Sequence, residues 1–157
     1  MKRGEKIMFG KGNSGTPKAA ESVSDAITTL TAFTEQLDKE GIHYRVNEER
    51  PIVSVPYSGK NFEGLNFMFV FDSDGNSYSL KVYSIEQFTA DQLPDAYEFC
   101  NAMNAEFRWI KFYVDSDNEF TAQDDGVVDV ATAGAECSEI LHRAVSIVDE
   151  VCKRLHE

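Results

Sequence analysis

The fold is decided by residues 94–123, which read PDAYEFCNAMNAEFRWIKFYVDSDNEFTAQ. Apolar residues in the first part recur at i, i+3, i+4 and i+7, and this spacing predicts an amphipathic helix that begins near Pro94. Residues 109–115 alternate between two faces, as a strand does, and DSDN at 115–118 predicts a tight turn into a returning strand. A helix followed by such a hairpin indicates an antiparallel sheet.

The same patterns extend outward in both directions along the chain. Helical spacing predicts a first helix over residues 23–37, which Gly41 ends, and a last helix over residues 137–155. Alternation predicts four strands between the first two helices, at 43–46, 52–57, 65–71 and 78–83. The order is therefore α-β-β-β-β-α-β-β-α, an α+β fold in which three helices pack on a twisted antiparallel sheet.

Three local features refine the predicted strands. Pro51 and Pro56 each lack a backbone N–H, so they predict that the strand over 52–57 lies at an edge or is interrupted. Gly75 in the segment DSDGN predicts a hairpin turn with a positive φ. Gly126 predicts a bulge, after which the returning strand continues over 127–130.

The last helix has one broad apolar stripe opposite a charged face. Acidic residues precede basic residues by four positions on the charged face, which predicts ion pairs worth about 0.2–0.5 kcal/mol each. The expected pairs are Glu139–Arg143, Asp149–Lys153 and Glu150–Arg154.

Charge is divided unevenly along the chain of 157 residues, whose formal net charge is −12. Residues 1–18 hold five Lys or Arg and one Glu, which gives +4, so the remaining residues carry −16. We expect residues 1–21 to form a flexible basic N-terminal tail and residues 22–157 to form a single domain. An acidic body of this charge repels phosphate backbones, which predicts no nucleic-acid partner.

The cysteines indicate the compartment. Cys100, Cys137 and Cys152 are odd in number and fall on apolar helix faces, which favours free thiols in a reducing cytoplasm over disulfides. The N-terminal segment lacks the apolar region of a signal peptide, and no run approaches the ~18 apolar residues of a membrane span. We therefore expect a soluble cytoplasmic protein with no membrane partner.

No motif in the sequence predicts a catalytic site, a metal site or a cofactor. Gly10-x-Gly12-x-x-Gly15 has the spacing of a dinucleotide fingerprint, but no strand precedes it and Pro17 follows where a helix should open. Residues 72–76 begin like a calcium loop but lack the glycine and glutamate that such a loop needs further on. The three histidines have no partner at metal-ligand spacing. An alternative pocket between sheet and helices, with Cys100 or His43, would need a convergent polar cluster.

Large side chains occupy both faces of the predicted strands. A sheet backed by one layer of helices needs only one apolar face. The large side chains on the second face therefore predict either a helix that covers this face or a contact surface for a partner or a second copy of the chain. The candidate protein-interaction residues are Met68, Val70, Tyr83, Trp109 and Tyr113.

Residues 101–117, NAMNAEFRWIKFYVDSD, resemble the YbjN family, which is described as bacterial sensory transduction regulators. The resemblance consists of a helix that ends in an Asn-rich segment and a strand of the form W-x-K-F-x-V-D-x-D, and it extends over about residues 22–157. It implies a fold similar to that of the type III secretion chaperones. Those chaperones are small, acidic, non-enzymatic and usually dimeric, and they hold an extended segment of a client protein.

The resemblance and the surplus of apolar side chains together predict a non-enzymatic protein-binding module, a chaperone-like adaptor or regulator in bacterial signalling. The resemblance implies a homodimer and a protein client, and the acidic body suits a basic client. The alternative is a small-ligand sensor or a small enzyme with a pocket between sheet and helices.

Overall fold

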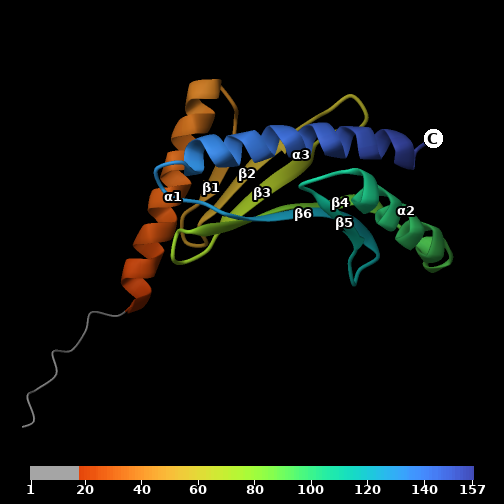
Figure 1. Cartoon of the computed structure of the whole chain (residues 1–157), viewed down its shortest axis with the longest axis horizontal. Coiled ribbons are helices and arrows are strands. Elements are labelled where there is room, and N and C mark those ends of the chain that lie inside the picture. Colours follow the sequence, from red (N-terminus) through yellow and green to blue (C-terminus); the bar gives the residue numbers. More distant parts are fainter. Residues whose placement is uncertain (1–17) are drawn as a thin grey trace, which may run out of the picture.

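The computed structural model describes residues 18–157, and it describes side chains from residue 25 onward. Figure 1 shows the elements in the predicted order of helices and strands. They are α1 (Lys18–Glu40), β1 (Arg45–Asn47), β2 (Ile52–Tyr57), β3 (Leu65–Phe71), β4 (Ser77–Gln87), α2 (Leu93–Glu106), β5 (Lys111–Val114), β6 (Glu119–Val127) and α3 (Ala133–Leu155). A short 3-10 turn, Ala90–Gln92, leads into α2.

Helix α1 begins earlier than the sequence indicated. Residues 18–21, which we assigned to the tail, belong to the helix. The remainder of the predicted tail, with its Gly10-x-Gly12-x-x-Gly15 pattern, lies outside the described residues. Helix α2 begins at Leu93 and carries Pro94 in its first turn, within one residue of the prediction.

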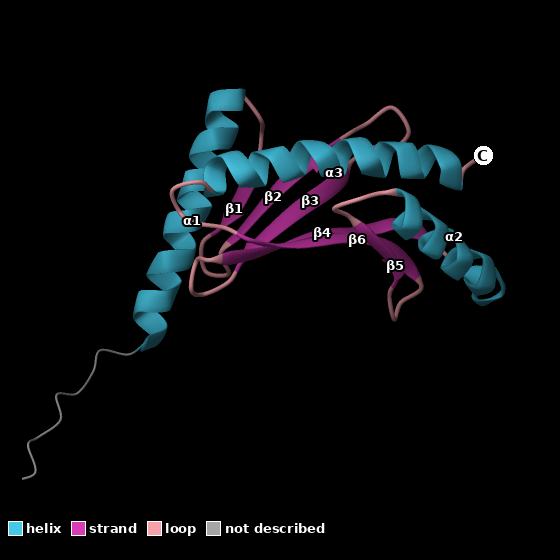
Figure 2. Cartoon of the chain, viewed as in Figure 1, coloured by secondary structure: helices cyan, strands magenta, loops and turns pink. Residues whose placement is uncertain are grey.

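The six strands form one antiparallel sheet in the order β1-β2-β3-β4-β6-β5. Helices α1 and α3 cross each other over one face of this sheet, and α2 lies beside β5 at one end (Figure 2). The α+β prediction is therefore confirmed. No helix of the described chain is both long enough and apolar enough to span a bilayer.

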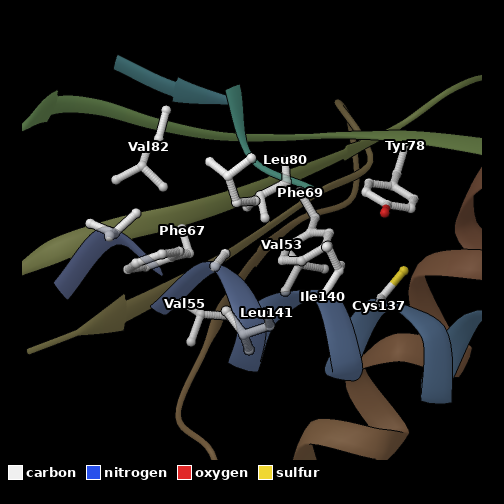
Figure 3. Close-up of a cluster of buried hydrophobic side chains, with 14 of the residues drawn as sticks. Val53, Val55, Phe67, Phe69, Tyr78, Leu80, Val82, Cys137, Ile140 and Leu141 are labelled. Carbon is white, nitrogen blue, oxygen red and sulfur yellow. The ribbon is translucent and has the colours of Figure 1, made fainter. Parts of the chain in front are cut away.

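The core lies between the sheet and the two crossing helices. Strand alternation sends Val53, Val55, Phe67, Phe69 and Leu80 to the same face, where Figure 3 shows them opposite the α3 residues Cys137, Ile140 and Leu141. From α1, the Phe33 ring packs on Phe69 with 4.6 Å between centroids. Rings in such tilted contact add to the hydrophobic stabilisation that their burial supplies.

Pro51, which precedes β2, and Pro56, which lies within it, did not make β2 an edge strand over its whole length. β2 lies between β1 and β3 and is uninterrupted. The carbonyl of Pro51 accepts a hydrogen bond from β3. Because the backbone groups of successive residues face the two neighbouring strands in turn, those of Pro56 face the β1 side. β1 pairs with β2 only up to Ser54, so the N–H that Pro56 lacks would have met no strand there.

The two predicted glycine features had different outcomes. Gly75 has φ +70°, as the hairpin prediction required. The bulge predicted at Gly126 is wrong, because β6 stays paired with β4 through Gly126 and ends at Val127. A Cβ at residue 126 would lie 2.5 Å from the ring of Tyr78, so the glycine makes room for that ring in an unbroken pair. The register shift occurs instead in β4, between Val82 and Glu86.

Two of the three predicted ion pairs of α3 form. Arg143 contacts Glu139 at 2.7 Å, and Arg154 contacts Glu150 at 3.0 Å. The predicted Asp149–Lys153 pair is wrong. Asp149 instead accepts hydrogen bonds from the backbone and side chain of Asn61, both at 2.8 Å, and so fixes the loop between β2 and β3 on α3.

Candidate functional site

The structure divides the five candidate residues between two surfaces. The strand register places Met68, Val70, Tyr83 and Tyr113 on the sheet face opposite the core, whereas Trp109 lies next to α3. None of the five belongs to the core cluster or to the partly buried residues packed on it. No helix of the described chain packs on the face that carries the first four, which we call the open face.

The open face has an apolar half and a hydrogen-bonded half. On β2 and β3, Ile52 lies opposite Val70 with Met68 beside them, and all three are half-buried. On β5 and β6, Asp125 accepts from Lys111 Nζ at 3.0 Å, and Tyr113 donates to Gln123 at 3.0 Å. Polar groups satisfied within the sheet have little need of a partner, so the apolar half is the better candidate for a contact.

Trp109 does not belong to the strand that the sequence predicted from it. The strand β5 begins two residues later, at Lys111. Trp109 has φ +75°, and the N–H of Ile110 donates to the carbonyl of Arg108 at 2.9 Å. These two features define a γ-turn centred on Trp109, of the rare and strained type. A bulky residue with a positive φ is an uncommon outlier, and surrounding contacts must hold it there.

Two guanidinium groups lie over the Trp109 ring. Arg108 lies 5.2 Å and Arg143 5.3 Å from the centroid of the ring. Both distances are within the range of cation–π attraction. Arg143 is also paired with Glu139, so one ion pair of α3 holds the ring in place. The ring is nevertheless 53% exposed.

A groove of about 630 Å³ lies beside Trp109, between the end of β6 and the first turns of α3. Its apolar wall includes Trp109, Val127 and Ile140, and Val127 is 86% exposed. A second hollow of about 530 Å³ lies between the segment after α2 and the middle of α3. The two hollows share Trp109 and Arg143 and therefore lie next to each other along α3.

The first groove, which we call the Trp109 groove, has an acidic lining. Its carboxylates are Asp124, Asp125, Glu136 and Glu139, against the single guanidinium of Arg143. Asp125 and Glu139 each have a cationic partner. Neither Asp124 nor Glu136 forms an ion pair with any described residue.

Asp124 is the carboxyl group of the groove whose pKa is raised. Burial raises its pKa, although the Tyr78 hydroxyl donates to it at 2.8 Å and opposes the rise. For Asp125, burial acts in the same direction, but hydrogen bonds from Ser79, Lys111 and Gln123 outweigh it and lower the pKa. A cation placed in the groove would favour the ionised form of Asp124.

The residues considered for chemistry do not converge. Burial raises the pKa of the Cys100, Cys137 and Cys152 thiols to about 11, 12 and 11, so they stay protonated and behave as small apolar groups. His43 is exposed and lies before β1, away from Cys100 in α2. Within residues 18–157, no three His, Cys, Asp or Glu side chains could hold a metal ion together.

The sequence did not reveal the groove residues as a group. In the sequence, the helix face that carries Glu136, Glu139 and Arg143 resembles an ordinary solvated face. Asp124 and Asp125 are adjacent strand residues, which predicts that their side chains point to opposite sides. Only the crossing of α3 over the end of β6 brings them together around Trp109.

The architecture defines the class of protein: an α+β protein with the fold of the type III secretion chaperones. The Yersinia pestis chaperone SycH, solved in complex with a stable fragment of YscM2, matches with TM-score 0.53 and 12% identity over 78% of this chain and 98% of SycH. The crystal structure of E. coli YbjN, described as "a putative transcription regulator", matches with TM-score 0.59 and 17% identity over 78% of this chain and 87% of that chain. At these identities the likeness concerns the fold alone.

The family follows from the sequence. A model of the YbjN family, described as "Putative bacterial sensory transduction regulator", matches residues 29–157. The chain therefore belongs to the YbjN family. No curated protein sequence matches it.

Proposed function

We propose that this chain is a non-enzymatic protein-binding module, a chaperone-like adaptor or regulator that holds part of a partner protein in the cytoplasm. The observation that carries the proposal is Trp109, whose exposed ring borders a groove while its backbone is held in a strained turn. Aromatic side chains next to pockets are the usual anchors of protein interfaces. Strain that the surrounding structure maintains is typical of binding sites.

The family and the fold support this proposal by analogy. The family is described as regulators, and SycH, which has a similar fold, was crystallised with a fragment of another protein. A shared fold is compatible with several functions, so the argument depends on the surface residues of this chain. The three unpaired cysteines suit a reducing compartment, which is why we place the protein in the cytoplasm.

The open face supports a second contact, which we assign to another copy of the chain. Ile52, Met68 and Val70 form an apolar area, bordered by Lys81 next to Met68, that no described helix covers. A homodimer would bury this area, and it would leave the Trp109 groove on the other side of each subunit free for a client. Under this proposal Val70→Lys makes the protein monomeric in light scattering, because a charge would be buried in the interface.

A small-molecule site is the alternative for the same groove, since its volume falls within the usual range of ligand pockets. Neither Cys100 nor His43 lines the groove, and the buried thiols are not activated as nucleophiles. We therefore favour a protein partner over a reaction or a sensed metabolite.

The experiment that tests the function is affinity capture from the native host, with quantitative mass spectrometry and mixing of the purified partner. Three variants are compared with the unchanged protein: Trp109→Ala at the groove, Val70→Lys on the open face, and Tyr97→Ala as a control. Tyr97 matches Trp109 in exposure, at 55% against 53%, but lies on α2 and lines neither hollow.

We expect a stoichiometric partner that Tyr97→Ala and Val70→Lys retain and that Trp109→Ala loses by at least about tenfold in affinity. Circular dichroism must show that each variant is folded. A partner that binds all three variants equally would overturn the assignment of the Trp109 groove as the contact surface. No partner at all would overturn the protein-binding proposal and move attention to small ligands.

A further inference from the structure

The strand β6 has a length of free edge next to the Trp109 groove. β5 pairs with β6 from Val114 opposite Phe120 to Lys111 opposite Gln123, and it goes no further. β6 continues to Val127 and pairs there with β4 alone (Figure 2). Residues 124–127 therefore have one side without a strand neighbour in the described chain.

The γ-turn at Trp109 is the cause of this free edge. A chain that entered β5 in an extended conformation would have continued the pairing opposite residues 124–127. The positive φ of Trp109 instead turns the chain away from β6 just before Lys111, and the buried Ile110 side chain fixes the turn to the core. The strained residue thus keeps the edge open.

The backbone groups that face the free edge follow from the alternation of an antiparallel ladder. Both backbone groups of Phe112 bond to Asn104, so they face away from β6, and those of Lys111 face Gln123. Two and four residues further along β6, Asp125 and Val127 face the same side as Gln123. The hydrogen bond from the N–H of Val128 to the carbonyl of Asn76 is consistent with this alternation. It shows that the backbone groups of Val128, and of every second residue before it in β6, face β4. The N–H and C=O groups of Asp125 and Val127 therefore point into the open space.

An unpaired edge beside an apolar groove can accept an extended peptide as a further strand. Alternate side chains of such a peptide would face the groove wall of Trp109 and Ile140, and the rest would face Asp125 and Val127. The carboxylates of Asp124 and Glu136, which have no ion-pair partner among the described residues, would face the peptide's basic side chains.

The same charges argue against a second copy in this position. Another copy would bring its own four groove carboxylates to the edge, and like charges at a contact are repulsive. A segment with Lys or Arg would neutralise Asp124 and Glu136 instead. Charge complementarity therefore selects a basic segment of a different protein.

We propose that the free edge of β6 at residues 124–127 binds an extended, basic segment of a partner protein as an additional strand in line with β5. This proposal rests on the protein-binding function and names the chemistry of the partner and the part of the chain that holds it.

The test uses the full chain and a short capped peptide in which lysine and valine alternate. Trp109 is the only tryptophan of the chain, so its fluorescence reports on the groove directly. Two further peptides serve as controls: one has glutamate in place of lysine, and the other keeps lysine but is N-methylated at every residue. The methylated peptide carries the same charge but has no backbone N–H to donate along either of its edges. This control matters because any basic peptide is attracted to a chain of net charge −12.

Two variants separate the backbone from the side chain at residue 127. Val127→Pro removes only an N–H that faces the free edge, so the pairing of β6 with β4 is kept. Val127→Ala shortens the side chain and keeps the N–H. Thermal unfolding of both variants establishes that they are folded.

We expect the lysine peptide to shift the Trp109 emission and the glutamate peptide to leave it unchanged. Val127→Pro should weaken binding by about tenfold, the effect of one lost backbone hydrogen bond, whereas Val127→Ala should weaken it less. N-methylation removes the peptide's donors to the carbonyls of both Asp125 and Val127, so it should weaken binding by more than about tenfold. Equal binding of the methylated peptide, or unchanged binding by Val127→Pro, would overturn the proposal and leave non-specific attraction. Dimerisation that Val127→Pro abolishes would also overturn it, in favour of a second copy.

The result can be separated from the test of the function itself. If a natural partner is lost from Val70→Lys but retained by Val127→Pro and Trp109→Ala, the chain binds protein through the open face and the β6 edge is not its site. If the unchanged protein captures no partner, the protein-binding function itself fails.

Discussion

The side-chain amide of Asn104 pairs with both backbone groups of Phe112. Its Nδ2 donates to the Phe112 carbonyl at 2.9 Å, and its Oδ1 accepts from the Phe112 N–H at 2.7 Å. A neighbouring strand would make the same two bonds, so Asn104 takes the place of a strand at the outer edge of β5. The last turns of α2 thereby cover an edge that would otherwise be free to pair with another chain.

Asn104→Asp should destabilise the fold, because it removes the donor and places a negative charge next to the Phe112 carbonyl. We expect a loss of about 1–3 kcal/mol in the free energy of unfolding, measured by urea denaturation. Asn101→Asp makes the same chemical change at an exposed position of α2 and should cost no more than about 0.5 kcal/mol. Equal losses in the two variants would attribute the effect to added charge on α2 and not to the lost bonds.

A pair of glycines separates backbone strain from steric contact. Gly64 has φ +65°, and a Cβ added there would have no atom within 4 Å. Gly75 has φ +70°, but a Cβ added there would lie 2.6 Å from the Asp25 carbonyl oxygen and 2.8 Å from Thr29 Oγ1. Gly64→Ala should therefore cost only the left-handed penalty of about 1–2 kcal/mol. Gly75→Ala should cost roughly 1–3 kcal/mol more, because it also pushes α1 off the turn.

The two alanine variants are compared by chemical denaturation. The Thr29 hydroxyl donates to the Gly75 carbonyl at 2.7 Å, so Thr29→Ala measures how much of the additional loss comes from this bond. Equal losses in the free energy of unfolding for Gly64→Ala and Gly75→Ala would mean that α1 shifts at Asp25 without a measurable loss of stability.

The features that the sequence predicted correctly are those that local periodicity determines. The stripe of α3, the alternation of β3 and the positive φ of Gly75 each follow from residues within a few positions of one another. Asp149 could not be predicted in this way, since its partner Asn61 is 88 residues distant and a nearer Lys153 was available. Trp109 was assigned to a strand because its neighbours alternate, and nothing in the letters distinguishes that strand from a γ-turn held by Arg143 of another element.

Acid should weaken the junction between α1 and α3 through Glu40. Its carboxylate accepts hydrogen bonds from Gln36 at 2.7 Å, Ser138 at 2.6 Å and His142 at 2.8 Å, and these bonds lower the pKa of Glu40 from 4.5 to about 2. Since the pKa is lower in the folded state than in the unfolded state, the ionised carboxylate stabilises the fold above about pH 4.5. This contribution is lost as the pH falls toward 2.

Glu40→Gln should therefore lower the midpoint of thermal unfolding at neutral pH by roughly 2–4 °C, a modest effect because solvent screens a side chain that is 26% exposed. The difference from the unchanged protein should shrink between pH 4.5 and pH 2. Glu35→Gln removes a charge from an exposed position of α1 and controls for net charge. A difference that stays constant down to pH 2 would contradict the role of the ionised carboxylate.

Trp109 should show an inverted order of stability between alanine and glycine. At most positions glycine is less stable than alanine by about 0.5–1 kcal/mol, because the unfolded chain gains freedom. At φ +75° a Cβ costs about 1–2 kcal/mol, which glycine avoids. Trp109→Gly should therefore be more stable than Trp109→Ala by roughly 1 kcal/mol, measured by circular dichroism in urea since neither variant retains a tryptophan.

The same comparison tests why a large aromatic residue occupies a position that suits glycine. Both variants lose the stacking on Arg108 and Arg143, so their difference isolates the backbone. Binding of the lysine peptide to these variants is measured by isothermal titration calorimetry, because neither has a tryptophan. If Trp109→Gly is at least as stable as the unchanged protein and still loses the lysine peptide, the ring contributes to binding and not to folding, a known trade-off between stability and function. A Trp109→Ala variant more stable than Trp109→Gly would mean that the turn at residue 109 is not strained in solution, and the free edge of β6 would then lack its cause.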